Sequence, residues 1–257
     1  MIPKSAKVTI SVAVAIILLA VTFLLLFGYQ SFAMLTMRSE VARFPVMDKT
    51  PIALTDFSVS RGSGKPISRF GYEFEVPWTD IDETKSIEFP DRIVIAFNSN
   101  KAMTFAAFPP HEFIDGVAST MHSTPEKLRA AFGEEATSDY EFKKLILNTT
   151  AHQMTFLTPW RQCNSMEMLL MFKAVMLPAP DIDLFSLEVH GFKGFQFGDP
   201  NRRPRKIGLE LYSQEGMVEF YVFQKADGQA AGISQEDLNY IMQSLHRTAN
   251  LKTALAK

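Results

Sequence analysis

The first feature along the chain is an unbroken apolar stretch from Val8 to Phe27. It reads VTISVAVAIILLAVTFLLLF, and its only polar side chains are Thr9, Ser11 and Thr22. Twenty helical residues rise by about 30 Å, which matches the thickness of a bilayer's hydrocarbon core. The pattern therefore predicts one uncleaved transmembrane helix over residues 8–28.

A cleaved signal peptide is the alternative interpretation of this stretch. Ser31-Phe32-Ala33 offers small residues at plausible cleavage positions. However, the apolar part of a signal peptide runs to about 7–15 residues, and this stretch is longer and lies too far from that site. A lipid-modified bacterial lipoprotein is excluded as well, because lipid attachment needs a cysteine just after the apolar stretch and none stands there.

Charges on either side of the stretch predict its orientation. Lys4 and Lys7 precede it with no acid beside them, whereas the first charges beyond it, in residues 38–43, are of both signs. Positive flanks favour the cytoplasmic side of a membrane. We expect residues 1–7 to be a cytoplasmic tail and the remainder to face the extracytoplasmic side.

Residues 29–50 have mixed polarity and predict a tether that leads to a single domain over residues 51–257. The domain opens with a loop at Ser58–Ser68 that is rich in Gly, Ser and Pro. In Phe70–Val76, apolar and acidic residues alternate, which is typical of a strand with one buried face. Ile93–Phe97 and Met103–Phe108 predict a hairpin.

Helical patterns occupy the middle of the domain, and strand patterns return afterwards. The expected helices begin after Pro109-Pro110, at Thr124-Pro125, at Ser138-Asp139 and at Ser165, and the last of them ends near Met176. Alternating strands follow around Phe195, Leu209 and Phe220, with a hairpin turn at Gln214-Glu215-Gly216.

The C-terminal helix has the clearest start signal in the chain. Ser234 is the expected N-cap, and Asp237 occupies the third helical position, where an acid can bond back to the cap amide. Ile233 and Leu238 are spaced to form a hydrophobic staple. Leu238, Ile241, Met242 and Leu245 would make the buried face.

This order of elements predicts an α+β fold, an antiparallel sheet sandwiched with helices and preceded by one transmembrane helix. Three segments, YEFEVPW (72–78), GFKGFQFG (191–198) and SQEDLNYIMQSLH (234–246), stand in the order found in PsbP/DcrB-like domains. Over residues 68–248 the chain resembles that group. The resemblance implies a helix–sheet–helix sandwich and a non-catalytic accessory role at a membrane or cell envelope.

Composition narrows the classes of function. Beyond the apolar stretch the domain has 24 Lys and Arg against 28 Asp and Glu, because Lys4 and Lys7 precede the stretch. A mildly acidic domain lacks the basic footprint of a nucleic-acid binder, so no nucleic-acid partner is expected. A single cysteine, Cys163, excludes an internal disulfide and a multi-cysteine metal site.

Candidate chemical sites have simpler structural interpretations. Cys163 has no histidine in a protease-like context and is expected to be an ordinary small side chain just before a helix. Asp80–Glu83 lacks the glycine and the distal glutamate of a calcium loop. His111 and Asp115 supply two possible ligands without a third. The methionines of residues 166–176 suit a core or a flexible groove. We expect no catalytic residues, no metal and no cofactor.

The strongest local charge feature is a basic loop between two expected strands. It contains Arg202, Arg203, Arg205 and Lys206. Such a cluster could dock an anionic partner or lipid headgroups. Alternatively, its charges guard the edge of the neighbouring strand in a solvated turn.

Two functions remain from the sequence. The first is a membrane-anchored, non-catalytic binding or accessory domain of the cell envelope, with lipid around residues 8–28 and a protein partner in the envelope. The alternative is an envelope hydrolase whose site is assembled from residues distant in sequence. An apolar groove would favour the first function, and a pocket with converging histidine and carboxylates would favour the second.

Overall fold

The computed structural model describes an α+β protein, as expected. Its contacts divide the chain into two compact units: unit 1 contains residues 1–49 and 146–180, and unit 2 contains residues 50–145 and 181–257. The expected single domain after residue 50 is thus interrupted by a segment that packs with the N-terminal part. The structure describes residues 4–59, 62–177, 179, 182–202, 206–224 and 232–248.

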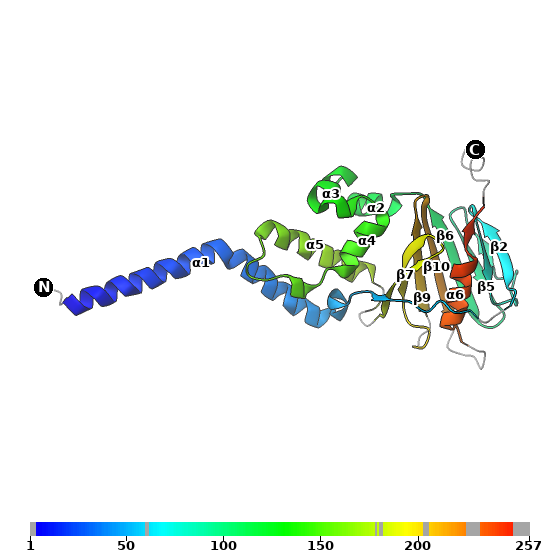
Figure 1. The fold of residues 1–257 in the computed structure, drawn as a ribbon, viewed down its shortest axis with the longest axis horizontal. Helices are drawn as coiled ribbons and strands as arrows, with labels where there is room; N and C mark the ends of the chain where they lie inside the picture. The colour runs from blue at the N-terminus through cyan, green and yellow to red at the C-terminus, as the bar shows by residue number, and fades with distance from the viewer. Residues whose placement is uncertain are drawn as a thin grey trace. The chain divides into compact units, whose positions relative to one another are not determined.

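Unit 1 is helical. It consists of α1 (Lys4–Arg43), η1 (Pro45–Asp48), the end of α4 (Asp139–Asn148), η3 (Ala151–Gln153) and α5 (Trp160–Met176). In place of an irregular tether, α1 continues to Arg43, and α5 lies alongside its second half (Figure 1). α5 begins five residues earlier than predicted, so Cys163 lies inside a helix and not before one.

A small buried cluster holds unit 1 together. Ala33 and Met37 of α1 belong to the same cluster as Cys163, Met166 and Leu170 of α5. Small side chains at such positions let two helices approach closely. The alternation of buried and exposed positions along residues 29–43 therefore reflects helix packing.

One charged side chain is fully buried in unit 1. Lys173 of α5 donates from Nζ to the carbonyl oxygen of Thr149, at 2.8 Å. Burial lowers the pKa of this ammonium group to about 8, and the nearby Asp48 charge acts in the opposite direction. The bond satisfies a carbonyl just beyond the end of α4 and joins α5 to that turn.

In the described part of the chain, no single helix is both long and apolar enough to cross a membrane. Val14–Leu24 and Phe27–Arg43 of α1 meet the length and composition requirement together, and their axes differ in direction by 58°. Gly28 is the second residue after the break, and glycine is found at helix kinks. The predicted membrane helix, residues 8–28, covers the first half of α1 and the bend, and its crossing of a membrane stays a prediction.

Unit 2 contains two sheets. The large one has the strand order β1-β7-β8-β9-β10-β6-β5-β4, and the small one the order β11-β3-β2. All pairs are antiparallel except β1 and β7, so the large sheet is mixed and the prediction of a purely antiparallel sheet is wrong at this edge. The strands are β1 (Ile52–Ala53), β2 (Lys65–Arg69), β3 (Tyr72–Val76), β4 (Ile87–Glu88), β5 (Arg92–Ala96), β6 (Lys101–Phe108), β7 (Leu184–Val189), β8 (Phe192–Phe197), β9 (Lys206–Ser213), β10 (Gly216–Gln224) and β11 (His246–Arg247).

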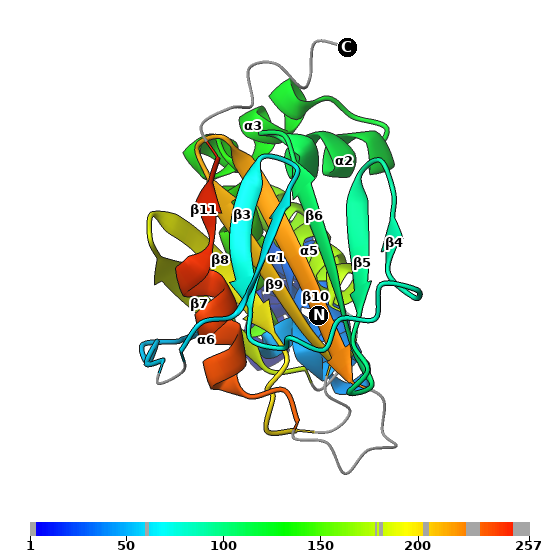
Figure 2. The ribbon, with the colours of Figure 1, turned by 90° about the vertical axis from the view of Figure 1, so that its right-hand side faces the viewer.

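Helices accompany these sheets. They are α2 (Glu112–Thr120), α3 (Pro125–Phe132), η2 (Gly133–Ala136), the first part of α4, and α6 (Gln235–Ser244). β3 and α6 cover the same face of the large sheet (Figure 2). The starts predicted for α2, α3, α4 and α6 are confirmed to within a residue or two.

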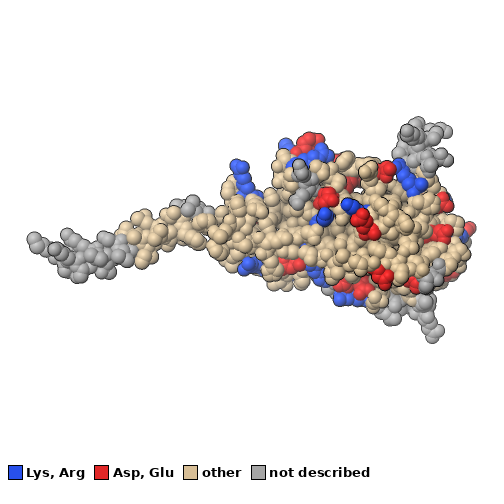
Figure 3. Space-filling view, in the orientation of Figure 1, with Lys and Arg blue, Asp and Glu red and all other residues tan. Residues whose placement is uncertain are grey.

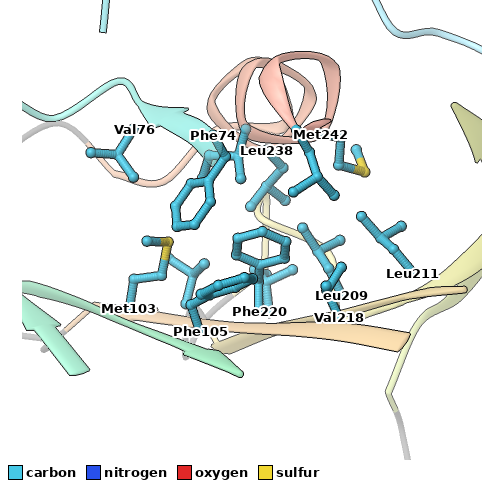
Figure 4. Packing of buried hydrophobic residues seen from close by; sticks show 14 of the residues in the cluster. Phe74, Val76, Met103, Phe105, Leu209, Leu211, Val218, Phe220, Leu238 and Met242 are labelled. Atoms are coloured by element: carbon cyan, nitrogen blue, oxygen red, sulfur yellow. The ribbon is translucent and has the colours of Figure 1, made fainter. Parts of the chain in front are cut away.

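The main core lies between the two sheets and α6. Phe74 of β3, Phe105 of β6 and Phe220 of β10 are fully buried, and their ring centroids are 4.7–5.0 Å apart (Figure 4). Leu238 and Met242 of α6 close this core from one side. The abundance of Phe in the sequence is thus used largely as dry packing between layers.

The bounds of some strands differ from the predicted bounds, and two hairpin turns explain the differences. Phe70 and Gly71, with φ of 51° and 79°, turn β2 into β3, so the strand begins at Tyr72. His190 and Gly191, at 48° and 84°, do the same between β7 and β8. Left-handed residues at both positions match the twist of a two-residue hairpin. β2 itself occupies part of the segment predicted as a loop.

The capping box of α6 is confirmed. Ser234 Oγ accepts the amide of Asp237 at 3.1 Å, and Asp237 Oδ2 accepts the amide of Ser234 at 2.9 Å. Two of the free amides at the helix start are therefore satisfied reciprocally. Ile233 and Leu238 are both buried in the core, as the staple predicts.

Ser234→Ala should lower the free energy of unfolding of unit 2 by about 1 kcal/mol, because the first turn of α6 loses its cap. Urea unfolding can be followed through Trp78, which is buried in unit 2, in a Trp160→Phe background. Thr120→Ala is the matched control, since that hydroxyl only bonds back to the Gly116 carbonyl within α2. Equal stability of the two variants would contradict the capping role.

Candidate functional site

Among the hollows lined by described residues of unit 2, two differ in chemistry. The first, of about 380 Å³, lies where α2 and α4 begin, beside β8 and β9. We call it the polar hollow. Its wall includes His111, Ser138, Asp139, Tyr140, Lys193 and Tyr212.

The two side chains at the start of α4 are engaged in helix caps. Ser138 Oγ accepts the amide of Glu141 at 3.2 Å, and Asp139 Oδ1 accepts the amide of Ile114 in the first turn of α2 at 3.0 Å. Burial raises the pKa of the Asp139 carboxyl, while the amides it accepts and the charge of His111 act in the opposite direction. The Ser138 hydroxyl caps the first turn of α4, and the Asp139 carboxylate holds the first turn of α2 against α4, which explains both side chains without catalysis.

Behind the polar hollow lies a buried charged cluster. Lys143 of α4 places Nζ 3.1 Å from both carboxylate oxygens of Glu210, and Tyr212 donates to Glu210 at 2.7 Å. The exposed fractions of the Lys143 and Glu210 side chains are only 6% and 16%. The ammonium group also lies 4.7 Å from the ring centroid of Phe113. A pair this well enclosed and satisfied orients α4 on the sheet.

Glu219 adds a second carboxyl to this charged cluster. It faces Glu210 directly in the register of β9 and β10. Burial and the Glu210 charge raise the pKa of Glu219, and Lys143 acts in the opposite direction. One cation thus serves two carboxyls, so a proton on Glu219 relieves the repulsion between them.

The second hollow, of about 670 Å³, lies at one end of the space between the two sheets. We call it the apolar cleft. Ala107 and Phe70 in its wall also pack against the main core, and Tyr72 forms part of that core. At the rim, Arg247 and Glu215 form an ion pair at 3.5 Å. The wall consists of Phe70, Gly71, Tyr72, Pro90, Asp91, Ala107, Phe108, Pro109, Pro110, Glu215 and Arg247.

The basic loop is only partly described. Arg202 pairs through Nε with Asp183 at 2.9 Å, and Lys206 is exposed at the start of β9. Arg203 and Arg205 lie outside the described residues. Docking of an anionic partner by this loop stays a prediction.

The remaining candidates from the sequence have local partners. Asp82 accepts bonds from the Thr84 hydroxyl and the Lys85 ammonium group, both at 2.6 Å, and these hold its pKa at about 2. Cys163 is buried, and its thiol lies 3.5 Å from the Thr158 carbonyl. Among the described residues, no three His, Cys, Asp or Glu side chains are grouped to hold a metal ion. Of the expected methionine core, Met166 is buried and Met171 is exposed.

Sequence patterns did not identify the charged cluster or the apolar cleft. Lys143 lies 67 residues before Glu210 along the chain, whereas Glu210 and Glu219 come from the consecutive strands β9 and β10. The sequence does contain two weak signals of this cluster. Glu210 and Glu219 alternate with apolar residues along their strands, and Lys143 stands among apolar positions of its helix. The wall of the cleft comes from five separate segments, and none of them carries a recognisable motif by itself.

Comparisons with known proteins leave the family open. No protein-family model matches the sequence, and no curated protein matches it at a significant level.

We predict that Glu219→Gln makes unit 2 more stable than the wild type near neutral pH. The folded wild type binds the Glu219 proton more tightly than the unfolded chain does, so its stability falls as pH rises from about 4.5 through the raised folded pKa. Removing the charge removes that loss. The measurement is the free energy of unfolding of both proteins from pH 4 to 8.

Lys143→Met supplies the opposite control. It leaves Glu210 buried without its cation and should cost about 3 kcal/mol, most of which Lys143→Met combined with Glu210→Gln should restore. A pH profile of Glu219→Gln parallel to that of the wild type would contradict our account of the charged cluster.

Proposed function

We propose that the chain is a membrane-anchored, non-catalytic binding domain that holds an elongated apolar ligand, such as a lipid acyl chain, in the apolar cleft. The observation that carries the proposal is the cleft itself. Its volume lies within the range of small-molecule sites, and its wall combines aromatic rings and prolines with a few charges at the rim.

The chemistry of the cleft matches such a ligand. Phe70, Tyr72 and Phe108 offer apolar surface, while Arg247, Glu215 and Asp91 offer polar groups to a headgroup at the rim. Because Ala107 and Phe70 also pack against the main core, a rigid layer supports the wall. A preformed wall lowers the entropy cost of binding.

The N-terminal helix supports the anchoring part of the proposal. The described surface of α1 from Val14 to Leu24 carries no charged side chain and continues the apolar stretch that begins at Val8 (Figure 3). Its large apolar side chains are exposed, Leu19 to 71%. Lipid is the solvent that suits such a surface. The charge asymmetry of the flanks supports a cytoplasmic N-terminus.

A hydrolase remains the less favoured alternative. In the polar hollow, the described Ser138 and Asp139 are held by helix caps, and Lys143 behind it is paired with Glu210. A nucleophile would need a base within hydrogen-bond reach. Binding in the apolar cleft does not require Ser138, Asp139 or Lys143 to leave the partners described above. We therefore assign the proposed function to the apolar cleft.

The test is photolabelling with a fatty acid that carries a photoreactive group, added to vesicles that contain the full-length protein. Labels should appear in peptides that contain Phe70–Tyr72 and Ala107–Pro110, as well as in the anchor. Ala107→Phe fills the apolar cleft and should reduce cleft labelling to the level of exposed loops, while labelling of residues 8–28 continues.

Ala53→Phe is the matched control, because Ala53 is exposed on edge strand β1. It should leave cleft labelling unchanged. Equal cleft labelling in the Ala107→Phe variant and the wild type would refute an apolar ligand in the cleft. An unlabelled anchor would refute the membrane attachment separately.

A further inference from the structure

We infer that unit 1 has a second contact with the bilayer: an apolar turn before α5, which inserts among the lipid headgroups beside the anchor. We call this the interfacial turn, consisting of Phe156, Leu157 and Trp160. The inference rests on the proposed membrane anchor and extends it to a surface that the anchor does not include.

The interfacial turn exposes large apolar side chains. Phe156 is 47% exposed, Leu157 65% and Trp160 54%. Three such residues lie within five positions, whereas exposed apolar residues on soluble proteins are commonly scattered singly. Turn tips usually carry Gly, Asn, Asp or Ser, so this composition needs a partner that accepts apolar groups.

The backbone of the turn forces these side chains outward. The Thr158 amide donates to the Thr155 carbonyl at 3.0 Å, and the Thr158 hydroxyl accepts the Thr155 amide at 2.9 Å. Phe156 and Leu157 are therefore the two central residues of a closed turn. Met154 and Cys163 on either side are buried in unit 1, so the turn is fixed on both sides.

The interfacial turn lies close to the end of the anchor. Tyr29, which follows the apolar stretch almost directly, hydrogen-bonds through its hydroxyl to Asn164 of α5. Trp160 precedes Asn164 by four residues, slightly more than one helical turn or ~6 Å along the axis. Trp160 therefore lies within roughly a helical turn of the level at which α1 would leave the membrane.

The bend in α1 is consistent with this position. Phe27–Arg43 differs by 58° from the direction of Val14–Leu24, so the second half leans toward the membrane plane if the first half spans. α5 packs alongside that second half (Figure 1). Phe32 and Leu35 extend exposed apolar surface along it.

The residue types fit the interface between water and lipid. Tryptophan favours the headgroup level, where its ring is apolar and its N–H can bond. The guanidinium carbon of Arg161 lies 5.7 Å from the Trp160 ring centroid, and this side chain can reach a lipid phosphate. The bond between Tyr29, at the end of the anchor's apolar stretch, and Asn164 of α5 brings the turn close to the anchor, and this favours lipid over a separate protein partner.

The experiment uses Trp160 itself as the probe, because the chain has only two tryptophans. Full-length Trp78→Phe protein is reconstituted in phosphatidylcholine–phosphatidylglycerol vesicles, with or without bromine on the acyl chains. A ring at the boundary of headgroups and acyl chains lies close to the bromines, so brominated lipid should remove roughly half of its emission. Trp160→Phe protein, which reports from the buried Trp78, should lose almost none.

A second pair of variants tests the interfacial turn directly. In the Trp78→Phe background, Phe156→Ser with Leu157→Ser should weaken quenching and shift emission to the red. Met171→Ser with Val175→Ser removes equally exposed apolar groups nearer the end of α5 and should change neither. Circular dichroism confirms that each variant is folded.

The two proposals fail in different ways. If the protein floats with the vesicles but Trp160 is quenched no more than Trp78, the interfacial turn is not in lipid and the inference is overturned while the anchor stands. A Trp160 covered by a protein partner would give that same result. If the protein does not float, the anchor fails, and the inference fails with it.

Discussion

Phe105, near the middle of β6, makes the contacts on which the rest of unit 2 depends. Its ring lies 4.7 Å from that of Phe74 across the two sheets and 4.9 Å from that of Phe220 on the neighbouring strand. Phe70 and Tyr72, at 6.0 and 6.4 Å, pack against the same ring from the wall of the apolar cleft. One fully buried aromatic side chain thus joins the core of the sandwich to the proposed ligand site, and the cleft owes its shape to that packing.

The two faces of the large sheet have separate tasks. One face is dry and supports the small sheet and α6, whereas the other carries Glu210, Tyr212 and Glu219 toward α4. Lys143 lowers the free-energy cost of burying charge on this face, because its ammonium group pairs with the Glu210 carboxylate at close range. Glu210, Glu219 and Lys143 resemble catalytic groups. Their pairing is explained by the need to satisfy charged side chains that α4 covers on this face of the sheet. Our proposal therefore assigns the function to the apolar cleft, where binding needs no catalytic group.

Local signals in the sequence predicted those parts of the fold that local interactions determine. The Ser234 capping box, the Thr124-Pro125 helix start and the alternation in β9 and β10 are all contained within short segments. The errors occurred where non-local packing decides. Phe70 and His190 adopt left-handed conformations that a bulky residue rarely takes, so the turns after β2 and β7 gave no usual signal.

Two larger features could not be predicted from local sequence patterns, because they too depend on packing between distant segments. Residues 29–50 were predicted as a tether because of their mixed polarity, yet residues 29–43 continue α1, and Ala33 and Met37 pack in one cluster with residues of α5. The pairing of Lys143 with Glu210 depends on how α4 crosses the sheet. Neither fact can be obtained from spacing along one segment.

The central claim is that the apolar cleft holds an apolar molecule while the chain sits in a membrane. Native mass spectrometry of the full-length protein, extracted in mild detergent, tests it most directly. We predict a protein ion with one bound lipid-sized adduct, which is lost on collisional activation and is absent from the Ala107→Phe variant. A bare polypeptide mass under the gentlest conditions, or the same adduct in both proteins, would contradict the account.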